Sequence, residues 1–260
     1  SIDTEGPLHE SLEATFQRIH DAFGIQLEPT EDNLIRLQKK QIPIGGKEND
    51  LADFIDPKYF CYNGDWSKID EMLNDILSPD FRNSLLDSFG NGWIYNWFCL
   101  DHVGYEENPR RRDIGYHNIF DHYLSRQKNQ QNKADGIHFH YHPQPFSRSA
   151  HHCATHFFSG NETLFQVLSR RIIDRGWFPS TFRPGFNTLR PDSNWFLEQY
   201  IPFCYGNQNC LHDKSQQPDL TPGRFGDWRR APLNWQPYHP DHDDYQVAGN
   251  CRRWELRCLN

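Results

Sequence analysis

The amino-acid sequence predicts an α/β protein built on a mostly parallel sheet or barrel. Apolar runs typical of strands alternate with amphipathic segments typical of helices along most of the chain. Two strand-like runs, 92–100 and 136–143, carry or lead into histidines, and barrels place their chemistry at the carboxyl ends of strands. The chain has 260 residues without an internal repeat or a linker, so we expect one catalytic domain over residues 1–260.

The first quarter of the chain predicts a strand, a helix and a long insertion. Residues 1–7 look like the end of a strand that breaks into a loop. Apolar residues then recur at helical spacing over 8–23, and Gly24 closes this helix. Residues 25–64 carry turn signals and a short helix near 31–40, and insertions of this length often cover a functional site.

Three helices are predicted around the central strands. Residues 65–77 are amphipathic, and Ser67 followed by Asp70 resembles a capping box. A shorter helix is expected over 81–89, and another over 116–127.

The run over 92–100 is apolar and aromatic without a break, which predicts a strand buried on both faces. It leads directly into Asp101 and His102. A polar pair at the carboxyl end of a buried strand serves either as part of a binding site or as a strand-end cap, and both interpretations stay open.

The stretch 136–143 has histidine at every second position, namely His138, His140 and His142. On a strand these three imidazoles would share one face. Histidine is the commonest metal ligand near neutral pH, and clustered imidazoles suit zinc or a similar divalent ion. The alternative is a polar strand face or a set of structural hydrogen bonds. Pro143 is expected to end the strand, because it cannot donate to a ladder.

Strand geometry limits which histidines can bind one ion. His138 and His142 would lie about 13 Å apart on a fully extended strand, too far for ligands that each sit about 2.1 Å from the metal. Either His138 and His140 therefore bind as strand neighbours, or the strand ends near His138 and the following residues coil so that His142 converges with it. The sequence leaves this choice open.

The last third of the chain alternates helices with short strands. A helix begins at Asn161 and ends before Gly176, a strand follows over 179–183, and another helix covers 192–200. The inward face of the first of these helices is expected to carry Leu164, Phe165, Leu168 and Ile172. Beyond Pro202 the chain is rich in Pro, Asn, Asp and Trp, and it closes on a strand-like run over 254–260.

Composition excludes some classes of partner. The net charge is −8, which argues against a surface for nucleic acid. The mean hydropathy is −0.86, and no apolar run has the length of a transmembrane segment. Seven cysteines form an odd set without a CxxC pair, which is typical of buried thiols in a reducing compartment. The expected location is therefore the cytoplasm.

Three pieces of the chain, in this order, resemble the NodB-like polysaccharide deacetylase family. They are the acidic opening with Asp3 and Glu5, the His138-x-x-x-His142 stretch, and the Thr-Phe-Arg-Pro-Gly run over 181–185. The opening is especially similar to bacterial members from O-antigen and other surface-polysaccharide gene clusters. The resemblance covers nearly the whole chain. It implies a distorted (β/α) barrel, here with a long insertion after the first helix, that holds one divalent metal ion, usually zinc.

The resemblance implies roles for individual residues near the metal. Asp3 matches the catalytic base of the family, and Arg183 matches the arginine that orients this base. His138 and His142 match the two metal-binding histidines, with His140 as an alternative ligand. The metal-binding Asp of the family corresponds to Thr4 here, so Glu5 is the alternative source of a carboxylate.

Later motifs of the family match less closely. Gly226-Asp227-Trp228 loosely resembles the fourth motif, and Trp228 is expected to stack on a sugar ring. His239 and His242 are candidates, by position alone, for the general acid of the last motif. Asp101 and His102 are expected to contact the substrate.

The expected function is therefore metal-dependent removal of N-acetyl groups from a sugar or glycan during surface-polysaccharide biosynthesis, with membrane association through the substrate. One alternative is a catalytically silent relative that binds a glycan or a partner enzyme. A second is another metal-dependent amidohydrolase. The histidine stretch alone also permits an iron oxygenase, although the predicted core strands contain no convincing His-x-Asp pair.

Overall fold

Six parallel strands form one sheet, and their order in space follows their order in the chain. The computed structural model describes residues 1–7, 11–56, 64–101, 117–129, 134–142, 161–189, 191–209, 226 and 228–258. The strands are β1 (Ile2–Thr4), β2 (Asn96–Asp101), β3 (Gly136–Tyr141), β4 (Thr181–Pro184), β5 (Phe203–Asn207) and β6 (Trp254–Arg257). The predicted parallel α/β sheet is confirmed, whereas β5 was not predicted.

The sheet is strongly curved, with side chains from distant strands meeting on its concave face. Neighbouring strands lie about 4.8 Å apart, so β1 and β4 would be about 14 Å apart in a flat sheet. Nevertheless, Arg183 Nε on β4 lies 2.8 Å from Asp3 Oδ1 on β1. The rings of Phe98 on β2 and Tyr205 on β5 likewise have centroids 5.6 Å apart. This curvature is compatible with a (β/α) barrel, and it gathers polar side chains on the inside.

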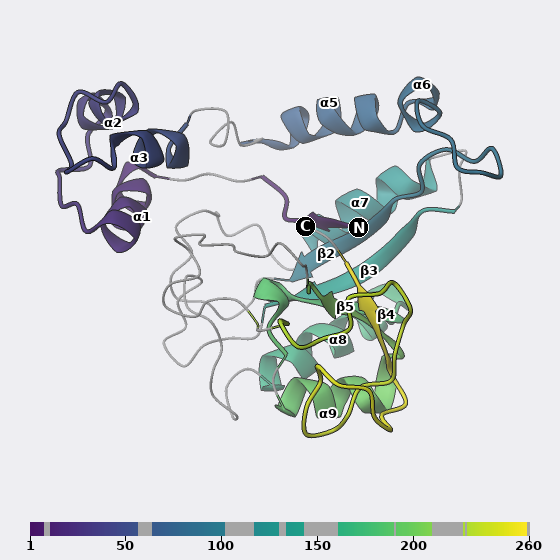
Figure 1. Ribbon diagram of the computed structural model, residues 1–260. Coiled ribbons are helices and arrows are strands. Elements are labelled where there is room, and N and C mark those ends of the chain that lie inside the picture. The colour runs from purple at the N-terminus through teal and green to yellow at the C-terminus, as the bar shows by residue number, and fades with distance from the viewer. Residues whose placement is uncertain are drawn as a thin grey trace.

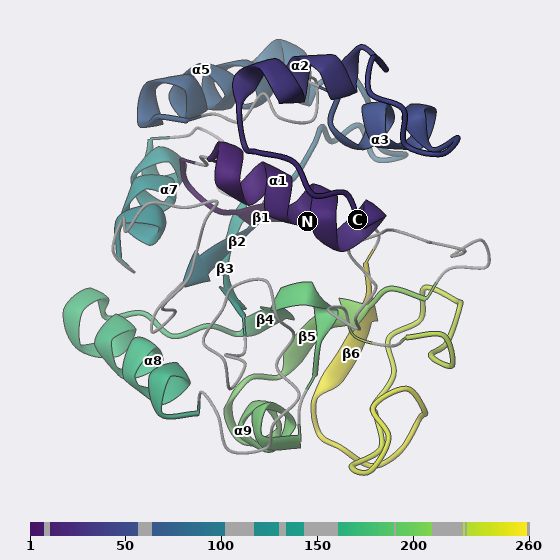
Figure 2. The same ribbon diagram turned by 90° about the vertical axis from the view of Figure 1, so that its left-hand side faces the viewer.

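Helices cover the convex face of the sheet (Figure 2). They are α5 (Trp66–Ile76), α7 (Asn118–Lys128), α8 (Asn161–Arg175) and α9 (Pro191–Tyr200). Outward side chains of β2, such as Trp97, are buried in one cluster with apolar residues of α5 and α7. Outward side chains of β3 and β4, such as Phe139 and Phe182, are buried in a second cluster with residues of α8 and α9. Successive side chains of a strand point to opposite faces. Since these apolar residues point outward, the residues between them point inward.

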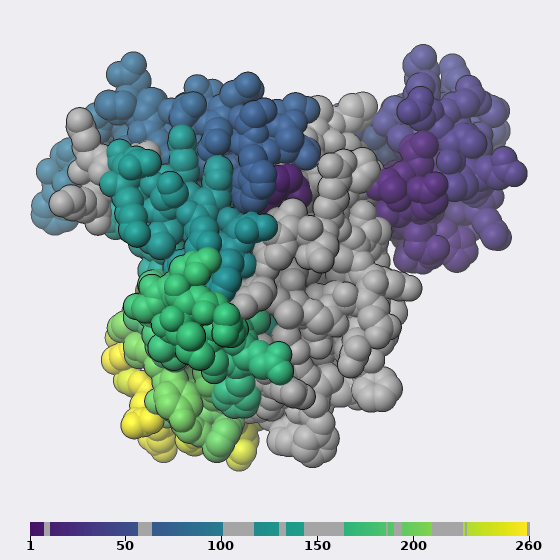
Figure 3. Space-filling model, turned by 180° about the vertical axis from the view of Figure 1, so that it is seen from behind, coloured from purple at the N-terminus to yellow at the C-terminus, as the bar shows by residue number. Residues whose placement is uncertain are grey.

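The segment after β1 folds into a lobe with a core of its own. It contains α1 (Leu12–Phe23), α2 (Glu31–Gln38) and α3 (Glu48–Phe54), which stand to one side of the sheet (Figures 1 and 3). Buried residues from all three helices form this core, among them Ile19, Leu37 and Leu51. α1 is the predicted first helix, and the long insertion predicted over 25–64 contributes α2 and α3, of which α3 was not predicted. Residues 8–10, at the predicted start of α1, lie outside the described residues.

Several local predictions were wrong in detail. The helix expected over 81–89 is only α6 (Pro79–Arg82), because Asp87 accepts hydrogen bonds from the backbone N–H groups of residues 89 and 91 and closes a turn instead. Helix α5 is capped by Asp65, which accepts from the N–H of Lys68 at 2.9 Å, and not by a capping box at Ser67.

The inward face of α8 also differs from the prediction. Leu164 and Leu168 are buried, as expected, but Phe165 and Ile172 are exposed. The four described cysteines, Cys99, Cys204, Cys251 and Cys258, are all buried. None of the described helices combines the length and the apolar character that crossing a membrane requires.

Candidate metal centre

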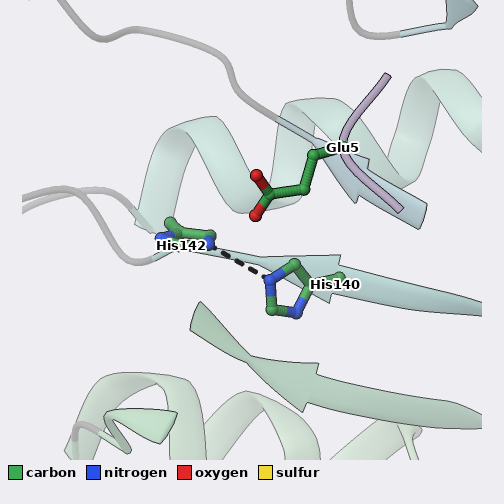
Figure 4. A group of neighbouring side chains, drawn as sticks. All are labelled: Glu5, His140 and His142. Atoms are coloured by element: carbon green, nitrogen blue, oxygen red, sulfur yellow. Dashed lines mark hydrogen bonds between the residues drawn. The ribbon is translucent and has the colours of Figure 1, made fainter. Parts of the chain in front are cut away.

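Two imidazoles and one carboxylate converge at the carboxyl edge of the sheet. Glu5 follows the last residue of β1, His140 is the next-to-last residue of β3, and His142 lies one residue beyond β3. Each offers one ligand atom, and these atoms all lie within 4.8 Å of one another (Figure 4). Strand register explains why these residues meet. Thr4 of β1 pairs with Cys99 of β2, and the next residue of β2, Leu100, pairs with His140 of β3. Glu5, the residue after Thr4, therefore lies level with His140.

The backbone of β4 fixes the orientation of His140. Its Nδ1 donates a hydrogen bond to the carbonyl oxygen of Arg183 at 2.9 Å, which leaves Nε2 as the acceptor nitrogen. Such a carbonyl partner sets the tautomer of many metal-binding histidines. Burial also lowers the pKa of His140, so the imidazole stays neutral, which is the form that binds a metal ion.

The spacing of the nitrogens fits a divalent ion. The Nε2 atoms of His140 and His142 lie 3.1 Å apart, with the rings perpendicular, and Glu5 points its carboxylate toward both (Figure 4). Two nitrogens bound at about 2.1 Å to a tetrahedral ion would be about 3.4 Å apart, so little movement is needed. Two histidines and one glutamate are also a known ligand set of catalytic zinc. The residues present therefore fit the metal that the resemblance implies.

A glycine after β4 makes room for His142. A Cβ atom at Gly185 would lie 2.2 Å from Cγ of the His142 ring and 2.6 Å from its Nδ1, well inside van der Waals contact. The ring can take its place only because residue 185 has no side chain. The sequence pattern gave no indication of this role, although a glycine directly after a strand can mark the close approach of another group to the backbone.

We expect Gly185→Ala to displace the His142 ring and to lower the metal affinity about 10- to 100-fold, the range seen when the support of a metal ligand is lost. Overpacking would also reduce the free energy of unfolding by about 1–3 kcal/mol. Competitive zinc titration and chemical denaturation measure the two effects. Gly176→Ala is the control for zinc affinity: its φ of +61° makes alanine strained and lowers stability, but a Cβ there meets nothing within 4 Å, so the affinity should not change. An unchanged zinc affinity in Gly185→Ala would contradict this role.

Asp3 and Arg183 form an ion pair beside the group. Arg183 Nε lies 2.8 Å from Oδ1 and 3.0 Å from Oδ2 of Asp3, and the guanidinium is almost fully buried. The Asp3 side chain keeps about a third of its surface exposed, with a relative exposure of 30%. Burial lowers the pKa of His140, and the negative charges of Asp3 and Glu5 act in the opposite direction and raise it. Both carboxylates therefore lie within electrostatic reach of the imidazole. The structure thus brings together Asp3, Glu5, His140, His142 and Arg183.

His138 does not belong to this group. Strand β3 continues through Tyr141, so the proposed coiling after His138 does not occur and His138 cannot converge with His142. Its Nε2 instead lies 2.8 Å from Oδ1 of Asn96, and burial lowers its pKa to about 4. The pairing of His138 with either of the other histidines was therefore wrong. Pro143, expected to end the strand, lies outside the described residues.

Thr4 faces away from the metal centre. Its side chain is buried, and Oγ1 donates to the carbonyl oxygen of Phe98 at 3.1 Å. Strand alternation places Thr4 on the face opposite Asp3 and Glu5. The carboxylate of the group accordingly comes from Glu5, the alternative source named from the sequence.

Trp228 cannot offer a face to a sugar ring. Its indole is 3% exposed, lies in the core with residues of α8 and α9, and donates from Nε1 to the carbonyl of Asn187 at 2.8 Å. The prediction of substrate stacking by Trp228 was therefore wrong. Gly226 is described, whereas Asp227 of the same motif lies outside the described residues.

His239 and His242 lie at the opposite edge of the sheet from the group. His239 donates from Nδ1 to the carbonyl of Arg253 at 3.1 Å and stacks on Trp254, the first residue of β6. In a parallel sheet the amino end of β6 faces away from the carboxyl ends of β1 and β3. Neither histidine can therefore serve as general acid at this centre. Their sequence position gave no information about which edge they occupy.

The remaining two predicted residues are Asp101 and His102. Asp101 ends β2, and its backbone pairs with Tyr141 of β3, directly before His142. His102 lies outside the described residues. Comparison of the whole chain with family models, curated proteins and solved structures gives no match.

Proposed function

We propose that this protein is a metal-dependent carbohydrate deacetylase of the NodB-like type, with zinc bound by Glu5, His140 and His142. The observation that carries the proposal is the convergence of these three ligand atoms within 4.8 Å at the carboxyl edge of a parallel sheet. That edge is where α/β proteins hold their active sites. The reaction is the release of acetate from an N-acetylated sugar.

Amide hydrolysis needs an activated water, support for the developing oxyanion and a proton for the leaving amine. When bound, the zinc ion supplies Lewis-acid chemistry that acidifies water and polarises the acetyl carbonyl. Asp3 supplies the proton acceptor, because its carboxylate is partly exposed and lies beside the ligand group, and once protonated it would return this proton to the leaving amine. Arg183 holds this carboxylate through Nε, while its carbonyl oxygen holds His140, so one residue of β4 aligns the base with a metal ligand.

The Asp3–Arg183 pair supports hydrolysis over the other chemistry open to two histidines and a carboxylate. Such a ligand set also suits non-haem iron, which activates oxygen and has no use for a positioned base. Here a fourth side chain, held by a buried guanidinium, stands next to the ligands without being one of them. A base of this kind is what a metal-assisted hydrolase requires.

The test combines metal analysis with product detection. The protein is purified without added metal and without a histidine tag, and its metal content is measured by mass spectrometry. Zinc-loaded protein is then incubated with N-acetylated sugars in nucleotide-linked, lipid-linked and oligomeric form, and released acetate is quantified. We expect stoichiometric zinc at this centre and acetate from at least one of the three substrate forms.

The variant Glu5→Gln gives the matched control, since it keeps the size of the side chain and removes the charge that holds a cation. Its metal affinity and its acetate release should fall together. Zinc-loaded protein that releases acetate from none of the three substrate forms would overturn the deacetylase assignment. Failure to bind zinc at all would overturn the metal centre itself.

A further inference from the structure

A second group of metal-ligand side chains lies at the other edge of the sheet. Glu198, His242 and Cys251 each offer one ligand atom, and these atoms lie within 4.8 Å of one another. Glu198 belongs to the last turns of α9, ahead of the amino end of β5, and Cys251 precedes the amino end of β6. The group is thus separated from the first centre by the length of the strands.

Two of the three residues belong to a long segment without regular structure. Between Trp228 and β6 the described chain contains no helix or strand, and only isolated bridges organise it, at Tyr238–Glu255 and Pro240–Ala248. The N–H of Cys251 donates to the carbonyl of Pro240 at 3.0 Å, which brings the two sides of this segment together near His242. Segments this long without secondary structure are uncommon in compact domains, and they need some other source of order.

The three donors suit zinc. Thiolate, imidazole and carboxylate are its ordinary ligands, and no other described cluster at this edge contains all three. Cys251 is only 2% exposed, whereas His242 is exposed, so an ion would reach a buried thiolate from the solvent side. Glu198 already accepts from the N–H groups of residues 252 and 253, and each carboxylate oxygen keeps a further lone pair.

A buried arginine makes the group suitable for a thiolate. Arg253 Nη1 lies 3.5 Å from Oε2 of Glu198, and its side chain is 1% exposed. Its Nε and Nη2 atoms are buried without a hydrogen-bond partner among the described residues. Buried donors of a charged group are costly when unpaired. The guanidinium also lies within electrostatic reach of the Cys251 sulfur, and its positive charge would stabilise the thiolate form that binds a metal ion.

We propose that Glu198, His242 and Cys251 form a second zinc site, which pins the segment between Trp228 and β6 to helix α9. A thiol nucleophile on the same three residues is the competing idea. Cys251 is only 2% exposed, whereas reactive cysteines are accessible. The geometry therefore favours a structural ion that cross-links the irregular segment.

Cobalt substitution tests the site separately from the first centre. Co²⁺ bound to a thiolate gives an intense charge-transfer absorption in the near ultraviolet, and the described residues of the first centre include no sulfur ligand. We expect this absorption in the cobalt-loaded protein, together with two metal ions per chain by mass spectrometry. In the double variant His140→Ala/His142→Ala the absorption should persist with one ion per chain, so failure of the first centre would leave this result intact.

The variant His242→Ala should abolish the absorption and remove one ion while retaining acetate release, since His242 is exposed and distant from the first centre. His20→Ala, which removes another exposed histidine, is the matched control. It should change neither the absorption nor the number of bound metal ions. Cys251→Ser should remove the absorption as well. If it misfolds, His242→Ala still decides the question. A protein that shows no thiolate absorption with cobalt, or that keeps it in His242→Ala, would overturn the proposal.

Discussion

Replacing His140 or His142 by alanine is expected to remove the metal ion of the first centre and, with it, nearly all deacetylase activity. Either change leaves one imidazole and one carboxylate of the three ligand residues found in the described part of the chain. We expect the zinc affinity of that centre to fall by more than about 100-fold, the upper range for loss of a residue that merely supports a ligand. Competitive titration with a fluorescent chelator measures the affinity, and metal analysis counts the ions that remain.

His138→Ala provides the matched control for this experiment. It removes an imidazole from the same strand and the same face, but one that is bonded to Asn96 and not to the group. We expect His138→Ala to keep its zinc at the first centre, with a change in stability only. The assignment of ligands would be wrong if His138→Ala lost the ion or if His142→Ala kept it at full affinity.

The histidine strand shows how far sequence alone reaches. Alternation on a strand correctly placed His138 and His140 on one face, and it pointed to the stretch that supplies two of the three candidate metal ligands. Which two histidines pair depended on where the strand ends, and the extent of β3 is set by hydrogen bonds to β2 and β4. Those partners are distant in sequence. Local pattern could therefore name the three candidates but could not select among them.

The sequence also did not show which residues are buried, nor at which edge of the sheet a residue lies. The parallel α/β sheet was predictable because buried strands and amphipathic helices leave strong local patterns. Strand β5 is short and contains Gly206, so its pattern is weak. Trp228 was expected to stack on a sugar because of a loose resemblance to a family motif, and His239 was a candidate general acid by position alone. Trp228 is buried, and His239 lies at the opposite edge of the sheet. Both errors concern contacts between distant parts of the chain.

The carboxylate of the candidate metal centre is a third feature that the sequence predicted only in part. Thr4 stands at the position that the family resemblance gives to a metal-binding Asp, and the structure turns it into the core. Glu5 is one residue further along, has a longer side chain and reaches the imidazoles from beyond the end of β1. Alternation made Glu5 share a face with Asp3, which is why it could be named as an alternative from the sequence.

Asp3→Asn is expected to keep the metal ion and to lower kcat by about 10²- to 10⁴-fold, the usual contribution of a general base. The amide has the shape of the carboxylate but cannot accept the proton of the attacking water. Asp3 is not among the three ligand residues, so the zinc content should stay at the wild-type value. Turnover is measured as acetate release per bound zinc at saturating substrate, so that loss of the ion and loss of the base are counted separately.

Arg183→Lys tests the same base from the other side of the ion pair. Lysine keeps the positive charge and the backbone carbonyl that holds His140, but it lacks the guanidinium Nε that contacts both oxygens of Asp3. We therefore expect retained zinc, an unchanged KM and a lower kcat. The pH profile of Arg183→Lys should also shift relative to that of the wild type, because the surroundings of the base have changed. Full turnover of zinc-loaded Asp3→Asn would exclude Asp3 as the base and would leave Glu5 as the remaining carboxylate of the centre able to take that proton.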